Sequence, residues 1–279
     1  MNDLLIPVFN RLGDYFGVWC IEPRAGHGLY QAIRSTDLSA HVRSALASPQ
    51  KVETPLQLLP GKGKSQIGLV PITGTMMKGQ SSLGGTSTIA ARRAIRQAAA
   101  DPNVSGILIA FDSPGGTSSG TADLAADVKA ASRKKPVYAQ IEDTAASAAY
   151  WVASQADRVF ANAPTALVGN VGTYLLMEDT SKANEEAGVR EIAFSSGPLK
   201  VFGGGLGVTE AQSQHMQGVV DAIQREFTAA VRSGRGLSDS RLEKVLTGAI
   251  FPATEAQKLG LIDGIHGMDR TLSLLTSAK

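Results

Sequence analysis

Stretches rich in apolar residues alternate with amphipathic stretches through the middle of the chain. Residues 67–72, 106–111 and 136–141 predict strands, and the second is a continuous apolar run, which is typical of a buried parallel strand. Between them, residues 86–100 leave a small apolar face at helical spacing, and residues 120–133 predict a second helix. Strand, helix and strand in this order indicate βαβ units with right-handed crossovers, and therefore an α/β fold.

The same pattern continues toward the C-terminus. A helix is expected over 147–155, a short strand over 158–161 and a further strand-like stretch over 190–194. A long helix begins at Thr209-Glu210, carries one apolar stripe and ends at Gly234 and Gly236. Two shorter helices are expected over 242–246 and 255–259.

The first 64 residues follow a different pattern. Apolar positions between Leu4 and Leu12 repeat at helical spacing, and a second helix is expected over 37–47. Three prolines and the run Gly61–Lys64 then form a loop. We therefore expect an N-terminal helical extension and linker over 1–64, packed on a main domain over 65–279. A pro-segment or docking arm is the alternative interpretation of the extension.

Composition narrows the function classes. The 279 residues carry 27 Lys+Arg against 25 Asp+Glu, a net charge of +2 that gives no electrostatic case for a nucleic-acid partner. The single cysteine, Cys20, excludes an intrachain disulfide and a cysteine-based zinc site. No apolar run approaches the roughly 20 residues of a membrane helix, and the N-terminus lacks the pattern of a signal peptide. We therefore expect a cytoplasmic protein without a membrane anchor.

A glycine-rich turn follows the predicted buried strand, in the run Asp112-Ser113-Pro114-Gly115-Gly116. Glycines leave backbone N–H groups unshielded, so that these can hold an oxyanion or pair with an extended peptide. A tight connection with no further role is the structural alternative.

Two further positions are candidates for nucleophilic catalysis. Ser147 lies among alanines, where a strand would meet a helix, and the small neighbours leave room for a substrate. An N-cap is its structural alternative. The four histidines are poorly placed to serve as its base. Lys200, in the loop that begins at Ser195-Ser196-Gly197, can serve if burial lowers its pKa, although most lysines are solvated surface groups.

Together these motifs resemble the signal peptide peptidase A family of serine proteases, which includes the phage protease C head-maturation enzymes. The resemblance rests on the Ser-Pro-Gly-Gly turn, the Ala-Ala-Ser helix start, the turn Gly169–Gly172, the loop that ends at Lys200 and the C-terminal segment Glu255–Asp263. Their order is specific, although no single motif is. The resemblance covers residues 66–267, and the first 60 residues look more like those of the phage and prophage branch.

The resemblance implies a fold like that of Clp protease and crotonase, and a role for each matching residue. Ser147 would be the nucleophile and Lys200 the general base of a Ser-Lys dyad that works through an acyl-enzyme. The N–H groups of Gly116 and Ala148 would form the oxyanion hole, and the backbone of Gly115 and Gly116 would pair with the substrate. It further implies a homo-oligomer that cleaves an extended polypeptide, such as a phage capsid or scaffold protein, in the host cytoplasm without a metal or cofactor.

Two departures from the family pattern bear on activity. Asn170 stands where the family usually has a serine that orients the lysine, so its amide oxygen would have to take that role. Ala148 and Ala149 stand where glycines are common, and their methyl groups narrow the site. Two other functions remain open: acyl-CoA chemistry of the crotonase type, for which no acidic pair is evident, and a non-catalytic capsid-assembly factor that retains the fold.

Overall fold

The computed structural model of the protein describes residues 17–35, 54–81 and 85–278. The helices expected over 4–12 and 37–47 lie outside these residues. In chain order, the strands are β1 (Trp19–Ile21), β2 (Gln57–Pro60), β3 (Gln66–Thr73), β4 (Met76–Met77), β5 (Thr86–Ser87), β6 (Val104–Ser113), β7 (Gly115–Thr117), β8 (Val137–Ala146), β9 (Arg158–Ala161), β10 (Leu167–Gly169), β11 (Ile250–Pro252) and β12 (Gly264–Ile265). The helices are α1 (Pro23–Ser35), α3 (Thr88–Ala100), α4 (Thr121–Ser132), α5 (Ala148–Ala153), α6 (Ser181–Glu186), α7 (Glu210–Arg235), α8 (Asp239–Val245), α9 (Ala253–Leu259) and α10 (Met268–Ser277).

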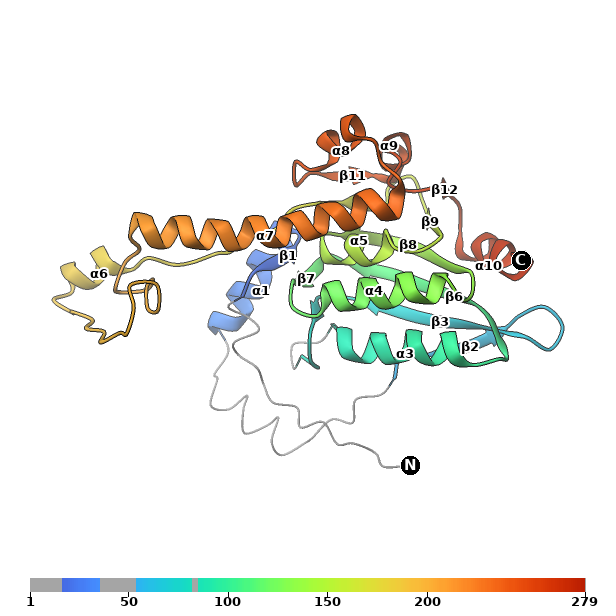
Figure 1. Ribbon diagram of the computed structural model, residues 1–279, viewed down its shortest axis with the longest axis horizontal. Helices are drawn as coiled ribbons and strands as arrows, with labels where there is room; N and C mark the ends of the chain where they lie inside the picture. Colours follow the sequence, from blue (N-terminus) through green and yellow to red (C-terminus); the bar gives the residue numbers. More distant parts are fainter. Residues whose placement is uncertain (1–16, 36–53, 82–84, 279) are drawn as a thin grey trace, which may run out of the picture.

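The larger sheet has a parallel centre. Its strands follow the order β11-β10-β8-β6-β3-β2, and β9 and β12 extend it from β8 (Figure 1). The neighbours β3, β6, β8 and β10 are parallel, while β2 and β11 pair antiparallel at the two edges. Because parallel strands need crossovers, α3 and α4 connect the central strands, as the alternating pattern predicted. The α/β fold class is therefore confirmed.

The smaller sheet has the order β1-β7-β4-β5. The chain enters it directly from the larger sheet, because only Pro114 separates β6 from β7. The expected Pro-Gly-Gly turn is thus a passage from one sheet to the other, and Gly115 and Gly116 already belong to a strand.

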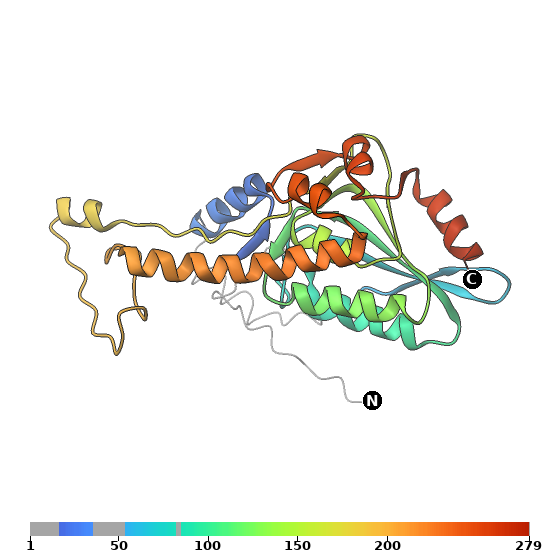
Figure 2. The same ribbon diagram turned by 45° about the horizontal axis from the view of Figure 1, so that its top comes forward.

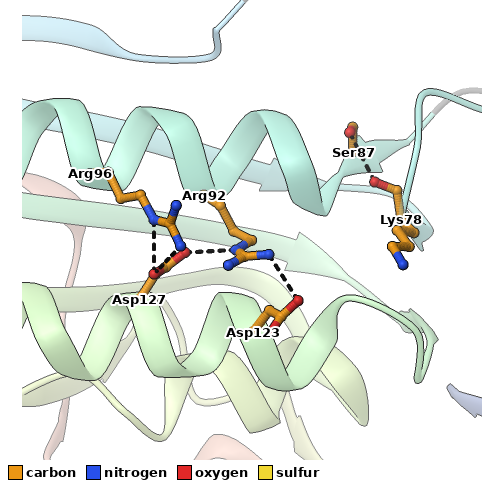
Figure 3. A network of polar contacts seen from close by, with 6 residues as sticks. All are labelled: Lys78, Ser87, Arg92, Arg96, Asp123 and Asp127. Atoms are coloured by element: carbon orange, nitrogen blue, oxygen red, sulfur yellow. Dashed lines mark hydrogen bonds and ion pairs between the residues drawn. The ribbon is translucent and has the colours of Figure 1, made fainter. Parts of the chain in front are cut away.

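Helices cover both faces of the larger sheet. Ile107 and Ile109 of β6 belong to the main core with Ala94 and Ile95 of α3, whereas Leu108, between them, packs with Leu275 of α10. This alternation is the period of a strand buried on both faces. Figure 3 shows how α3 and α4 are also joined at their surface: Arg92 of α3 forms ion pairs with Asp123 and Asp127 of α4, at 2.8 and 2.7 Å.

An arm projects from this body. Residues 175–209, which include α6, run away from the sheets and return at the start of α7, a helix of 26 residues and about 39 Å (Figures 1 and 2). Only the second half of α7 buries side chains against the body, and these are Phe227 and Val231. Phe227 stacks on Trp151 of α5 with ring centroids 4.8 Å apart.

The sequence-based elements of the main domain are largely confirmed, with two differences. Residues 190–194 form no strand, because they lie in the exposed arm, where no neighbouring strand accepts their hydrogen bonds. The stretch before residue 65 contributes β1 and β2 to the two sheets, and α1 follows β1. No helix among the described residues is long and apolar enough to cross a membrane.

Candidate active site

Ser147 lies between the end of β8 and the start of α5, as expected. Its backbone has φ 54° and ψ −119°, and Asn170 is the only other described non-glycine residue with a positive φ. Such torsions cost an L-residue roughly 1–3 kcal/mol and cluster at functional sites. The Ser147 side chain makes no capping hydrogen bond; instead Oγ lies 3.3 Å from the carbonyl oxygen of Gly172, to which it donates. Ser147 is therefore the N-cap residue of α5 by position, but its side chain does not cap the helix.

The predicted glycines lie beside Ser147. A Cβ at Gly115 would lie 2.9 Å from the Ala146 oxygen and 3.0 Å from the Ala148 nitrogen, so this close approach requires glycine, as does its φ of 101°. Gly116 packs against Met76 of β4 even more tightly, since a Cβ at Gly116 would lie 1.8 Å from the Met76 oxygen. The fold thus brings Gly115, Gly116, Ser147 and Ala148 together.

The strand β1 covers the free edge of this arrangement, which sequence reasoning missed. It pairs antiparallel with β7, and Cys20 lies opposite Gly116. The Glu22 N–H donates to the Pro114 oxygen at 2.8 Å, and hydrogen-bonded pairs alternate in an antiparallel ladder. The alternation therefore assigns the Gly116 N–H to the Cys20 carbonyl oxygen. The one available signal was the apolar run Val18–Ile21, which is too short to stand out.

Asn170 is held by its own turn. Its Nδ2 donates to the Gly248 oxygen at 2.6 Å, and its backbone N–H donates to the Ala249 oxygen at 2.7 Å. The residue is 7% exposed and has a φ of 52°, a conformation that asparagine tolerates better than most residues. The side-chain amide therefore joins this turn to the segment that leads into β11.

Lys200 lies apart from these residues. It is exposed on the arm, where the neighbouring Pro198 accepts a hydrogen bond from Gln212 Nε2 at 2.7 Å. The chain beside the Ser147 site meets α7 further along, since Thr173 Oγ1 donates to the Val220 oxygen. From Gln212 to Val220 the helix rises about 12 Å. A single chain therefore does not bring the two predicted dyad residues together.

Two groups at β1, the Cys20 thiol and the Tyr174 phenol, are held in their neutral forms. Burial raises the pKa of the Cys20 thiol from its ordinary value near 9 to about 12. Burial also raises the pKa of Tyr174, and the nearby Glu22 and Cys20 act in the same direction. The described residues contain no group of three or more histidine, cysteine or acidic side chains placed to hold a metal ion.

Two solved structures resemble the fold at low sequence identity. An enoyl-CoA hydratase/isomerase family member has 16% identity and a TM-score of 0.47, covering 80% of this chain and 74% of its own. A point mutant of ClpP1 from Listeria monocytogenes has 15% identity and a TM-score of 0.46, covering 73% of this chain and 94% of its own.

Several curated proteins resemble the sequence. The head-tail preconnector protein GP5 of Enterobacteria phage P21 is 32% identical over 221 residues, which are 76% of this chain and 43% of that protein. The capsid assembly protease C of Escherichia phage lambda is 30% identical over 221 residues, 76% of this chain and 49% of that protein. Protease 4 of Salmonella typhi is 25% identical over 204 residues, 73% of this chain and 33% of that protein. The chain thus spans less than half the length of each of these three relatives.

A family model described as Peptidase family S49 matches residues 129–279, more than half of the chain. Ser147, Ala148, Asn170 and Lys200 lie within the matched residues, whereas the glycines of β7 precede them. The resemblance inferred from the ordered motifs is therefore confirmed, and the chain belongs to peptidase family S49.

Proposed function

We propose that the protein is a serine endopeptidase whose nucleophile is Ser147. The observation that carries this proposal is the strained backbone of Ser147, which stands at a strand–helix junction beside the Ala148 N–H and the close-packed Gly115. A sharp turn of this kind presents a serine hydroxyl and the following N–H on the same side of the chain. A peptide carbonyl placed there would meet the hydroxyl with its carbon and the N–H group with its oxygen.

Lys200 is the proposed general base. In its neutral form its Nζ takes the proton from Ser147 Oγ as the oxygen attacks the peptide carbonyl, and it then gives that proton to the leaving amine. Water hydrolyses the resulting acyl-enzyme with the same lysine as base. The N–H groups of Gly116 and Ala148 stabilise the oxyanion, and each such donor contributes about 3 kcal/mol to the transition state. Asn170 is proposed as the residue that orients the lysine.

A second copy of the chain is the proposed source of that lysine. Lys200 lies on the arm, away from Ser147 of its own chain, and the arm exposes many large apolar side chains. These are Leu176, Met177, Val189, Ile192, Phe194, Leu199, Val201 and Leu206. Apolar surface of this extent favours burial against a partner. In a homo-oligomer, the arm of one copy would therefore cover its neighbour and deliver Lys200 to the neighbour's Ser147.

The proposed substrate is an extended polypeptide, specifically a capsid or scaffold protein of a phage or prophage, cleaved in the host cytoplasm during head maturation. The support for this finer assignment is the pair of phage relatives, whose names refer to capsid assembly and to the head-tail preconnector. The division into an extension over 1–64 and a peptidase domain over 65–279 is also retained as a proposal.

Inactive variants test the dyad and its origin in two chains. Ser147→Ala and Lys200→Ala should each lower cleavage of a peptide substrate by about 10³-fold or more, since the two groups act as a unit. Mixing the two variants should restore about a quarter of the wild-type activity, because random assembly in a symmetric oligomer places an intact serine against an intact lysine at one junction in four.

Matched controls separate chemistry from folding in this experiment. Ser154→Ala at the end of α5 and Lys182→Ala on the same arm should keep their activity. Absence of any recovery on mixing, with both variants folded and oligomeric, would show that the dyad does not join two copies. A Lys200→Ala variant with most of its activity would exclude this lysine as the base.

A non-catalytic capsid-assembly factor is the second candidate. The observation that favours it is the complete burial of Ser147, together with the pairing of Gly116 to β1. A fluorophosphonate probe discriminates between the two functions, because it reacts only with an activated serine. Labelling that is lost in Ser147→Ala supports the peptidase, whereas an assembly factor remains unlabelled in every oligomeric state.

A further inference from the structure

The segment Val18–Glu22 lies where the proposed function requires a substrate. We propose that this segment is a built-in, substrate-like occupant of the active-site cleft, and that it must leave before another polypeptide can bind. The inference rests on the proposed function, since it gives a regulatory role to a strand at the same site. It also predicts which side chains the cleft accepts.

Both edges of β1 are paired as those of a bound substrate strand would be. On one side β1 runs antiparallel to β7 from Trp19 to Ile21. On the other side Trp19 exchanges two hydrogen bonds with Tyr174, of 2.8 and 3.0 Å. Tyr174 follows closely on Gly172, whose oxygen accepts from Ser147 Oγ. The segment therefore lies between the two walls that flank the nucleophile.

The register places one carbonyl group at the proposed oxyanion hole. The Cys20 oxygen accepts from the Gly116 N–H in the alternating ladder described above. The point where a Gly115 Cβ would stand is 2.2 Å from the Cys20 oxygen and 3.0 Å from the Ala148 nitrogen, so oxygen and nitrogen flank the same small space. The bond between Cys20 and Ile21 thus occupies the position of a scissile peptide bond.

The side chains of the segment point to opposite faces and indicate the substrate class. Cys20 is fully buried in the main core, which leaves room for a small side chain before the scissile bond. Trp19 and Ile21 point the other way and form a separate apolar cluster with Met77. We therefore expect the cleft to accept extended segments with a small residue at the Cys20 position and large apolar residues on either side of it.

The docked segment closes the site, but only one of its three strand residues, Cys20, belongs to the main core. Ser147 is 0% exposed, so a polypeptide cannot reach it while β1 is in place. The strand has only three residues, and its outward-facing side chains belong to a small cluster outside the main core. Because only Cys20 of the three residues packs in the main core, we expect the segment to open locally at a lower free energy than the global unfolding of the domain.

Cys20 reports on the departure of β1 because it is the only cysteine of the chain and is buried. In the full-length protein, the alkylation rate of Cys20 and the fluorophosphonate labelling rate of Ser147 are measured together. Ile21→Asp places a carboxylate in the cluster beside Trp19 and should raise both rates roughly 10- to 100-fold, since a buried unpaired charge favours the open strand. Leu59→Asp, on the short edge strand β2, is the matched control and should raise neither rate.

A reversible crosslink tests occupancy directly. Trp19 and Thr117 are opposite residues of a pair that is not hydrogen-bonded, a geometry that suits a disulfide. In a Cys20→Ala background, Trp19→Cys with Thr117→Cys should block Ser147 labelling when oxidised and restore it on reduction. Pro60→Cys with Gln66→Cys, the corresponding type of pair between β2 and β3, should leave labelling unchanged in both states.

The outcomes separate this inference from the proposed function. Labelling of Ser147 at equal rates in the oxidised and reduced forms would overturn the inference and leave the peptidase intact. Ser147 that stays unreactive in Ile21→Asp, although Cys20 is alkylated rapidly, would contradict the peptidase and with it the substrate-like role. A cleavage product that begins at Ile21, absent in Ser147→Ala, would support the inference further.

Discussion

Ser147 and Lys200 lie in two regions that differ in whether their apolar side chains are buried or exposed. Around Ser147, strands β6, β8 and β10 and helix α5 are buried nearly throughout. Around Lys200, the arm leaves its apolar side chains in solvent: among the described residues, eight of the nine exposed large hydrophobic ones lie between residues 176 and 206. The body is therefore complete as a folded unit, whereas the arm has the composition of an interface without its partner.

Helix α7 connects these two regions and shows the difference along a single element. Its second half buries Phe227 and Val231 against the body, whereas Met216, Val219 and Val220 on the same apolar stripe remain partly exposed. One apolar pattern thus serves folding at one end and, in our proposal, assembly at the other. Each of the following predictions alters one side of this comparison.

The largest effect is expected from the arm. Phe194 is 97% exposed, and Phe194→Asp should disperse the oligomer and lower peptidase activity by about 100-fold or more, since a charge at the centre of an apolar interface is costly. The melting temperature of the body should not change. Light scattering and a cleavage assay measure the two effects, and Leu58→Asp, an exposed apolar residue on β2, is the control. An oligomer that survives Phe194→Asp with full activity would separate the arm from assembly.

The next largest effect is expected where α7 joins the body. Phe227 is fully buried against Trp151, so Phe227→Ala should lower the free energy of unfolding by about 3–5 kcal/mol. Met216→Ala, on the same stripe but half-exposed, should cost less than about 1 kcal/mol in the isolated chain. Denaturant titrations of the two variants compare the halves of the helix directly, and equal losses would contradict the division between them.

Substitutions of Asn170 distinguish two roles of this residue, which are to orient the lysine and to hold its own turn. If it orients the lysine, Asn170→Ala should lower kcat by about 10- to 100-fold with little change in KM, and it should also destabilise the fold by roughly 1–2 kcal/mol through the lost bond to Gly248. Asn170→Gly tolerates the positive φ and should recover part of the stability without recovering kcat. An unchanged kcat per folded molecule in both variants would limit Asn170 to its turn.

The smallest effect concerns the pH dependence of the closed site. Because burial raises the pKa of Cys20 to about 12, its stabilising contribution is complete below the ordinary thiol pKa near 9 and is lost as the pH rises toward 12. Wild type should therefore lose stability relative to Cys20→Ala by about 1.4 kcal/mol per pH unit above pH 9. Burial, the largest cause of the raised pKa of Tyr174, is common to both proteins, so most of its contribution cancels in the difference. Unfolding curves of both proteins between pH 7 and 10.5 measure the difference in their free energies of unfolding. A difference that stays constant with pH would show that the thiol is exposed to solvent.

The main domain was largely predictable because its signals are local. The apolar run of β6, the small-residue faces of α3 and α4, and the stripe and capping residue of α7 each reflect the burial or the end of one element. The placement of Ser147 followed in the same way, since a strand and a helix that meet leave a residue between them. Asn170 was also placed correctly in a tight turn, because its φ of 52° suits few other residues.

The contacts that only the tertiary structure decided are non-local. A strand of three residues has too few positions to show a period, so the pairing of β1 with β7 depends on a partner almost a hundred residues away along the chain. The ordered motifs predicted that Ser147 and Lys200 act as a pair, but the order of motifs in a sequence does not give the distance between two residues in the folded chain. Because no residue of the arm that bears Lys200 is buried in its own chain, its path is set by the returning helix α7 rather than by any local pattern, and that path separates the two residues.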